Sequence, residues 1–105
     1  MMTVEIGIGL TTFPDILSAK STISKLLVEN LISCAQIDKE IESHYIWKGE
    51  VRVTTEVRVM VKFNTNNAEK IETVLLKLHP YDTPEWVRWE AECSYSYAEW
   101  IRNPN

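Results

Sequence analysis

The chain has 105 residues, of which 45% are hydrophobic and 25% are charged, and its net charge is -4. These values fit one globular domain, residues 1–105, with no room for a second. The acidic balance argues against a nucleic-acid surface, which needs clustered Lys and Arg, and no apolar run reaches the roughly 20 residues of a membrane span. We therefore expect a cytoplasmic protein that binds neither nucleic acid nor membrane and keeps Cys34 and Cys93 reduced.

The first part of the chain predicts a strand followed by a helix. Residues 3–12 are rich in β-branched and aliphatic side chains, and Gly7 and Gly9 within them would let another backbone approach closely. A proline then interrupts the strand, and Asp15 is suited to cap a helix. Apolar residues at helical spacing follow from position 16 to about position 30, so we expect an amphipathic helix there.

The centre of the chain predicts a long β-hairpin. Strand character returns at residues 31–37, where Cys34 is expected to be a small core residue. Residues 50–63 carry mostly apolar side chains at odd positions and polar ones at even positions, which is the period of a half-buried strand. Residues 44–47 form the incoming strand, with Gly49 at the turn because glycine readily adopts a positive φ.

The length of this hairpin indicates an assembly. A strand from Glu50 to Phe63 at about 3.3 Å per residue spans roughly 45 Å, whereas a compact domain of this size has a radius of gyration of about 13 Å. The tip should therefore protrude, exposing unpaired strand edges and the side chains of Tyr45, Ile46 and Trp47. We expect a homo-oligomer in which the hairpins pair between subunits.

The second half of the chain adds a helix, a strand and a short terminal helix. Asn66 or Asn67 is suited to cap a helix whose apolar residues recur at helical spacing up to Leu78. Residues 85–91 predict the last strand, and Ser94 is suited to cap the final helix. The order strand, helix, strand, strand, helix, strand is typical of the α+β ferredoxin-like βαββαβ fold, in which one antiparallel sheet carries both main helices on one face.

The loop at residues 79–85 carries the densest set of functional side chains. Its two prolines hold an imidazole, a phenol and two carboxylates with little conformational freedom. His79 could be a metal ligand, a general base, or a helix-end histidine that bonds free carbonyls. Asp82 and Glu85 could bind a cation, although Asp82 is equally suited to forming the turn. The simpler alternative is a connector whose prolines only stop the helix.

At several places the chain resembles the CutA family of divalent-cation tolerance proteins, over nearly its whole length. The matching segments are Thr11-Thr12 with Pro14-Asp15, Leu27-Val28-Glu29, Cys34-Ala35, Ser43-x-Tyr45-x-Trp47-x-Gly49 with Glu56, His79-Pro80-Tyr81-Asp82-Thr83-Pro84-Glu85, and Tyr97-x-x-Trp100. The resemblance implies a homotrimer of ferredoxin-like subunits, related in architecture to the PII signalling proteins. Its hairpins would pair across subunit boundaries.

The resemblance also implies a ligand-binding cleft between subunits. The shared cleft residues match Tyr45, Trp47, Glu56, Lys62, His79, Tyr81, Glu85, Tyr97 and Trp100. Copper or another divalent cation is the implied cofactor, with His79, Asp82 and Glu85 as candidate metal ligands. Some bacterial relatives carry a cysteine near Thr11, and a hydroxyl is a poor substitute for it as a copper ligand.

Several of these positions keep a structural alternative. Glu56 and Lys62 share one face of their strand and could be plain solvent-facing charges. Four aromatic residues could pack at a subunit interface without touching a ligand: Tyr45, Trp47, Tyr97 and Trp100.

The function favoured by these expectations is a homotrimer that binds a divalent cation or small ligand at subunit boundaries, serves metal tolerance and catalyses no reaction. The alternatives are a small enzyme that uses His79 with Asp82 or Glu85 as acid and base, and a PII-like signalling or scaffold trimer. No nucleophile elbow, phosphate loop or metalloprotease spacing supports the enzyme.

Overall fold

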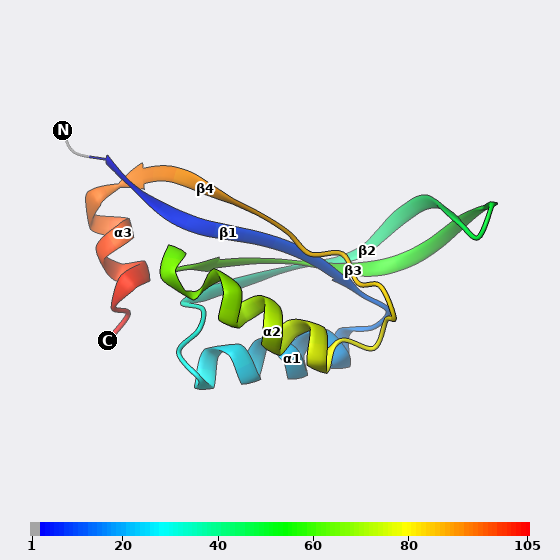
Figure 1. The fold of residues 1–105 in the computed structure, drawn as a ribbon, viewed down its shortest axis with the longest axis horizontal. Coiled ribbons are helices and arrows are strands. Elements are labelled where there is room, and N and C mark those ends of the chain that lie inside the picture. Colours follow the sequence, from blue (N-terminus) through cyan, green and yellow to red (C-terminus); the bar gives the residue numbers. More distant parts are fainter. Residues whose placement is uncertain (1–2) are drawn as a thin grey trace.

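The computed structural model describes residues 3–105, which form a four-stranded antiparallel sheet with two helices side by side on one face (Figure 1). The elements in chain order are β1 (Thr3–Phe13), α1 (Ile16–Val28), β2 (Cys34–Trp47), β3 (Glu50–Phe63), a 3-10 turn (Thr65–Asn67), α2 (Ala68–Leu78), β4 (Val87–Ser94) and α3 (Tyr95–Arg102). The strands lie in the order β2-β3-β1-β4. This arrangement confirms the predicted α+β ferredoxin-like fold.

The main hydrophobic core lies between the sheet and helices α1 and α2. The odd-numbered residues of β3 from Val57 to Phe63 are buried in it, as their period of two predicted. The largest fully buried side chains of this core are Phe13, Phe63, Leu26, Ile71, Leu75, Val59 and Val61.

The sheet face opposite α1 and α2 is only partly covered. Helix α3 packs against one end of it, where Ile6, Ala98 and Ile101 form a second small cluster. Val87 and Trp89 lie on this same face. They are four and two residues before Ala91, which pairs with Ile6, and every second residue of a strand faces the same side. They remain 53% and 40% exposed, so much of this face has no covering layer within one chain.

Gly7 and Gly9 make room for aromatic rings. A Cβ atom at Gly7 would lie 2.2 Å from Cε2 of Phe63, and one at Gly9 would lie 2.3 Å from Cη2 of Trp86. The two rings stack with their centroids 6.4 Å apart. The expected close approach is therefore present, but the prediction that a backbone makes it was wrong.

The β2–β3 hairpin extends beyond the body of the domain, as its length predicted (Figure 1). The chain measures 49 × 27 × 23 Å along its principal axes. Lys48 and Gly49 have φ values of 51° and 80°, and both therefore adopt the left-handed conformation that a tight hairpin turn requires. The register of β2 against β3 shifts between Asp38 and Ile41, which is a bulge of the kind that increases the twist of a hairpin.

Two predicted helix caps are present and one is not. At the start of α1, the side chain of Asp15 accepts a hydrogen bond of 2.7 Å from the backbone N–H of Ser18. At the start of α3, the hydroxyl of Ser94 accepts one of 3.4 Å from the backbone N–H of Tyr97. Asn67 precedes α2, but its side chain donates to the carbonyl of Leu31 instead of capping the helix. It therefore ties the start of α2 to the turn after α1.

Several element boundaries differ from the predicted ones. Helix α1 ends at Val28 because Asn30 takes a left-handed φ of 58°. Strand β2 is one strand from Cys34 to Trp47, where separate segments at residues 31–37 and 44–47 were predicted. Strand β4 spans Val87–Ser94, where residues 85–91 were predicted. None of the helices within residues 3–105 is long and apolar enough to cross a membrane.

Candidate functional site

Residues 79–86 connect α2 to β4 and begin with a sharp change of direction. His79 has an extended backbone, with φ of -70° and ψ of 136°, as the following Pro80 requires. Its backbone N–H still bonds the carbonyl of Leu75, so the chain leaves the helix at this residue. The side chain of His79 turns inward, where only 8% of the residue is exposed.

The imidazole of His79 is hydrogen-bonded through both ring nitrogens. Nε2 lies 2.7 Å from the carbonyl oxygen of Thr12 and 3.3 Å from Oγ1 of Thr11, and the backbone N–H of Tyr81 donates to Nδ1 at 3.2 Å. Because a carbonyl only accepts, Nε2 carries the proton and Nδ1 is the acceptor. The ring also stacks on Phe13, with centroids 4.4 Å apart. His79 thus bonds a carbonyl of β1, whereas the helix-end alternative expected a carbonyl of α2.

Burial lowers the pKa of His79 below its ordinary value of 6.5, although the carbonyl of Thr12 and the carboxylate of Glu56 partly oppose this shift. A second proton would sit on Nδ1 and face the N–H of Tyr81, so the folded chain resists protonation. Below about pH 6.5 the unfolded chain binds a proton that the folded chain does not. The neutral, buried His79 therefore contributes its full stabilisation above the pKa that it has in the unfolded chain. This stabilisation is lost as the pH falls toward the lower pKa of His79 in the folded chain.

We predict that lowering the pH from about 7.5 to about 5 reduces the free energy of unfolding, and that His79→Gln removes part of this dependence. The measurement is urea unfolding at several pH values and one protein concentration. His44→Gln is the matched control, because it makes the same change at the other histidine of the chain, which is exposed on the hairpin. The loss of pH dependence should be larger in His79→Gln than in His44→Gln. Equal pH dependence in the wild type and His79→Gln would contradict the prediction.

Tyr81 joins the loop to the central strand β3. Its hydroxyl donates a hydrogen bond of 2.7 Å to Oε2 of Glu56, which is 9% exposed. Burial, and then the hydrogen bond to this carboxylate, raise the pKa of Tyr81, so the phenol stays protonated and remains a donor. The bond links residues 25 positions apart and fixes the loop against the hairpin base.

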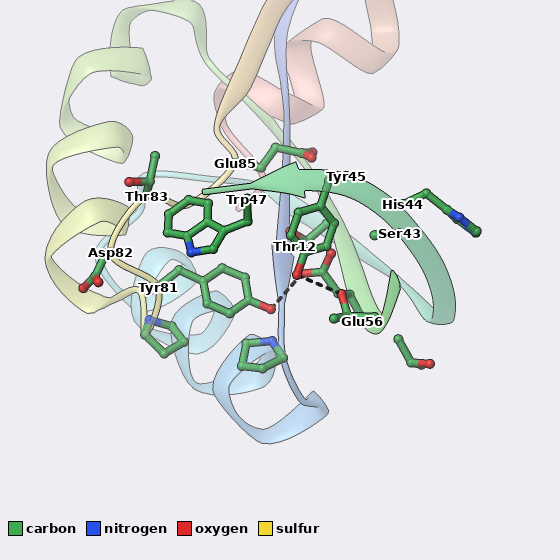
Figure 2. A pocket seen from close by; sticks show the side chains of 14 residues that line it. Thr12, Ser43, His44, Tyr45, Trp47, Glu56, Tyr81, Asp82, Thr83 and Glu85 are labelled. Atoms are coloured by element: carbon green, nitrogen blue, oxygen red, sulfur yellow. Dashed lines mark hydrogen bonds between the residues drawn. The ribbon is translucent and has the colours of Figure 1, made fainter. Parts of the chain in front are cut away.

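A cavity of about 850 Å³ opens between the protruding part of the hairpin, the end of β1 and the loop that follows α2. Its walls are Thr12, Pro14, Ser43, His44, Tyr45, Trp47, Thr54, Thr55, Glu56, Pro80, Tyr81, Asp82, Thr83 and Glu85. Figure 2 shows the rings of Tyr45, Trp47 and Tyr81 gathered near Glu56, with Asp82 and His44 at opposite edges. The cavity therefore combines aromatic walls with carboxylates.

The predicted site residues divide into two groups within one chain. Tyr45, Trp47, Glu56, Tyr81, Asp82 and Glu85 line the cavity, and His79 is buried directly behind Tyr81. Lys62, Tyr97 and Trp100 form the other group: the Tyr97 and Trp100 rings stack at 6.0 Å, and Nζ of Lys62 lies 5.8 Å from the Tyr97 centroid. Glu56 and Lys62 are six residues apart on β3, which is roughly 20 Å along a strand. One chain does not bring the two groups together.

Some residues of the cavity wall were not predicted. Ser43, Thr54, Thr55 and Thr83 contribute small hydroxyl side chains to it. Thr55 could have been identified from the sequence. It is a polar residue at an odd position of β3, where the alternating pattern predicts an apolar one.

The metal ligands expected from the sequence do not form a site within one chain. Among residues 3–105 there is no group of three or more His, Cys, Asp or Glu side chains placed to hold a metal ion. His79 could bind a metal only by giving up its bond to Thr12 or to Tyr81. Asp82 and Glu85 are exposed at the cavity and keep their carboxylates available. A general-base role for His79 meets the same obstacle, because neither imidazole nitrogen is free.

These features define a class of protein: a ferredoxin-like domain with an extended hairpin and an aromatic, acidic cavity between the hairpin and the loop that follows α2. Comparison with known proteins gives the family. Residues 8–104 match the family model described as CutA1 divalent ion tolerance protein, so the chain belongs to that family.

Individual relatives agree in sequence and in structure. The chain is 34% identical over 92 residues to the divalent-cation tolerance protein CutA of Pyrococcus horikoshii, covering 87% of this chain and 89% of that one. A solved structure of the CutA1 protein of Thermus thermophilus superposes with a TM-score of 0.88 at 33% identity, covering 92% and 95% of the two chains. The CutA1 structure from Ehrlichia chaffeensis gives a TM-score of 0.87 at 28% identity, covering 91% of each chain.

Proposed function

We propose that three copies of this chain assemble into a homotrimer that binds a divalent cation or small ligand at its subunit boundaries and serves divalent-cation tolerance in the cytoplasm. The observation that carries the proposal is the division of the family's site residues into two groups roughly 20 Å apart on one chain. A neighbouring copy that presents Lys62, Tyr97 and Trp100 to the cavity would complete the set.

The exposed apolar surface supports an assembly. Ile46 and Val51 are cross-strand partners near the hairpin tip and are 73% and 79% exposed. On the body of the domain, Val87 and Trp89 are exposed on the open sheet face. Exposed apolar surface and unpaired strand edges are features that soluble monomers avoid, and the edge strands β2 and β4 each have one free side within a single chain.

The proposed role is binding and not catalysis. His79 has no free ring nitrogen, and its place behind Tyr81 suits a residue that positions the cavity wall. A divalent cation such as copper would take oxygen ligands from Asp82 or Glu85 and its remaining ligands from a second copy, because one chain does not supply a set of three.

The hairpin tip provides a test of assembly. We predict that Ile46→Lys combined with Val51→Lys converts the trimer to a monomer, because two facing lysines repel each other and cannot be buried at an interface. Light scattering after gel filtration measures the change. Leu17→Lys is the matched control, since Leu17 is 76% exposed on α1, away from the hairpin, and this variant should remain a trimer. A hairpin variant with wild-type mass would contradict the proposal.

A growth assay tests the proposed role in divalent-cation tolerance. Expression of the wild-type chain should raise the copper concentration at which a bacterial host lacking its own CutA stops growing, and the hairpin variant should not. Calorimetry of the purified trimer with Cu²⁺ and with Zn²⁺ reports whether a metal is the ligand. An intact trimer that gives no growth advantage would remove the tolerance role and leave the assembly in place.

A further inference from the structure

The cavity wall carries an excess of negative charge. Three carboxylates line it, those of Glu56, Asp82 and Glu85, and the described residues of its wall include no Lys or Arg. If a neighbouring copy adds Lys62, as proposed above, the carboxylates still outnumber the ammonium group. An anionic ligand would meet repulsion in such a cavity, whereas a cation would be attracted.

Of these three carboxylates, that of Glu56 should attract a cation most strongly, because Glu56 is buried and the other two are exposed. Its carboxylate is nine-tenths buried at the inner wall, and the bond from Tyr81 to Oε2 is the only hydrogen bond it makes to the described residues. Nε2 and Nδ1 of the nearby His79 are both engaged, and the ring is held neutral. A buried carboxylate without a cationic partner is costly, and a cation in the cavity would reduce that cost.

The rest of the wall selects the kind of cation. The rings of Tyr45, Trp47 and Tyr81 face the same space, and aromatic faces bind weakly hydrated organic cations through their negative π-surfaces (Figure 2). A bare divalent ion instead needs about four to six ligand atoms that converge on a small space. The cavity has about 850 Å³, and no group of three ligating side chains converges within residues 3–105.

We propose that the occupant of this cavity is a small organic ammonium ion, held between the aromatic rings with Glu56 as its buried counter-ion and Asp82 and Glu85 at the entrance. The inference deepens the proposed function, on which it rests, by giving the chemical class of the small ligand. Amines and quaternary ammonium compounds share this chemistry, and choline represents it in the test.

The test compares choline with 3,3-dimethyl-1-butanol, which has the same shape but carries a carbon in place of the charged nitrogen. Calorimetry of the full chain should show choline binding about tenfold more tightly than the neutral alcohol, and more weakly as salt is added. Trp47→Leu should weaken choline binding about tenfold, whereas Trp47→Phe, which keeps an aromatic face, should lose less.

A second pair of variants tests the carboxylates. Asp82→Asn with Glu85→Gln should weaken choline binding about threefold, as expected for partly exposed charges. Glu69→Gln with Glu72→Gln makes the same change of charge on the outer face of α2 and should leave binding unchanged.

Native mass spectrometry of the same samples separates failure of the ligand class from failure of the proposed function. Equal binding of choline and the neutral alcohol, or an intact trimer that binds Zn²⁺ but no choline, would overturn the ammonium inference while the proposed trimer stands. A monomer that still binds choline through Trp47 would support the inference and overturn the trimer.

Discussion

Replacing Gly7 by alanine should lower the free energy of unfolding by about 3 kcal/mol. The new Cβ atom would lie 2.2 Å from Cε2 and 2.6 Å from Cδ2 of Phe63, both well inside van der Waals contact. Phe63 has little room to move away, since it is 1% exposed and stacks on Trp86. Either β1 or the ring must shift, and both lie in the main core. Urea unfolding at one protein concentration measures the loss, because the stability of an oligomer depends on concentration.

Gly49→Ala is the control that separates crowding from backbone strain. Gly49 has no neighbouring atom within 4 Å of an added Cβ but has a φ of 80°, so its substitution should cost only the left-handed penalty of about 1 kcal/mol. Combining Gly7→Ala with Phe63→Leu should cost less than the sum of the two single changes, because the smaller side chain frees space. Additive losses, or a Gly7→Ala loss no larger than that of Gly49→Ala, would contradict the steric account.

Replacing His79 by leucine should also lower the free energy of unfolding by about 3 kcal/mol. Leucine fills much of the same volume but leaves the carbonyl of Thr12 and the N–H of Tyr81 without their partners, and it ends the ring stacking on Phe13. His44→Leu makes the same change at an exposed position of the hairpin, where it removes only a contact with the side chain of Glu42, and it should cost less stability than His79→Leu.

Ligand binding by His79→Leu and by Tyr81→Phe tests whether His79 positions Tyr81. If His79 positions Tyr81, then His79→Leu should weaken ligand binding together with stability, and Tyr81→Phe should weaken binding by removing the bond to Glu56. A His79→Leu variant with wild-type stability would show that the hydrogen bonds and the stack contribute little.

The fold could be predicted because its elements carry strong periodic signals. The alternation from Val57 to Phe63 marks one face of β3 as buried, and the core lies on that face. Asp15 and Ser94 each cap a helix by accepting a hydrogen bond from a backbone N–H three residues later. Such caps can be predicted from the sequence because both partners lie close together in it. The length of the hairpin was equally readable, since strand geometry fixes the rise per residue.

The site was less predictable because it depends on strand register and on contacts between distant segments. The loop 79–85 was identified by its prolines and polar side chains, but the bond from Tyr81 to Glu56 joins residues 25 positions apart and depends on how the fold places the loop. Asn67 had the right type and place for a cap, yet it bonds Leu31 because tertiary contact offered a better partner. Gly7 indicated a close approach without showing that a ring fills the space.

The division of the site residues into two groups could not be read from the sequence. Glu56 and Lys62 share a face of β3, which was evident, but only the positions of the loop and α3 show that each belongs to a different cluster. This division is the physical reason to expect that a complete site needs a second copy of the chain.

We therefore infer that this chain functions as a trimer whose subunit boundaries complete the binding site. Native mass spectrometry of the full chain, purified without added metal, tests it most directly, because it reports subunit number and any retained ligand together. We expect a species of three times the 12.2 kDa chain mass at low micromolar concentration. A spectrum that contains only the 12.2 kDa monomer would contradict it.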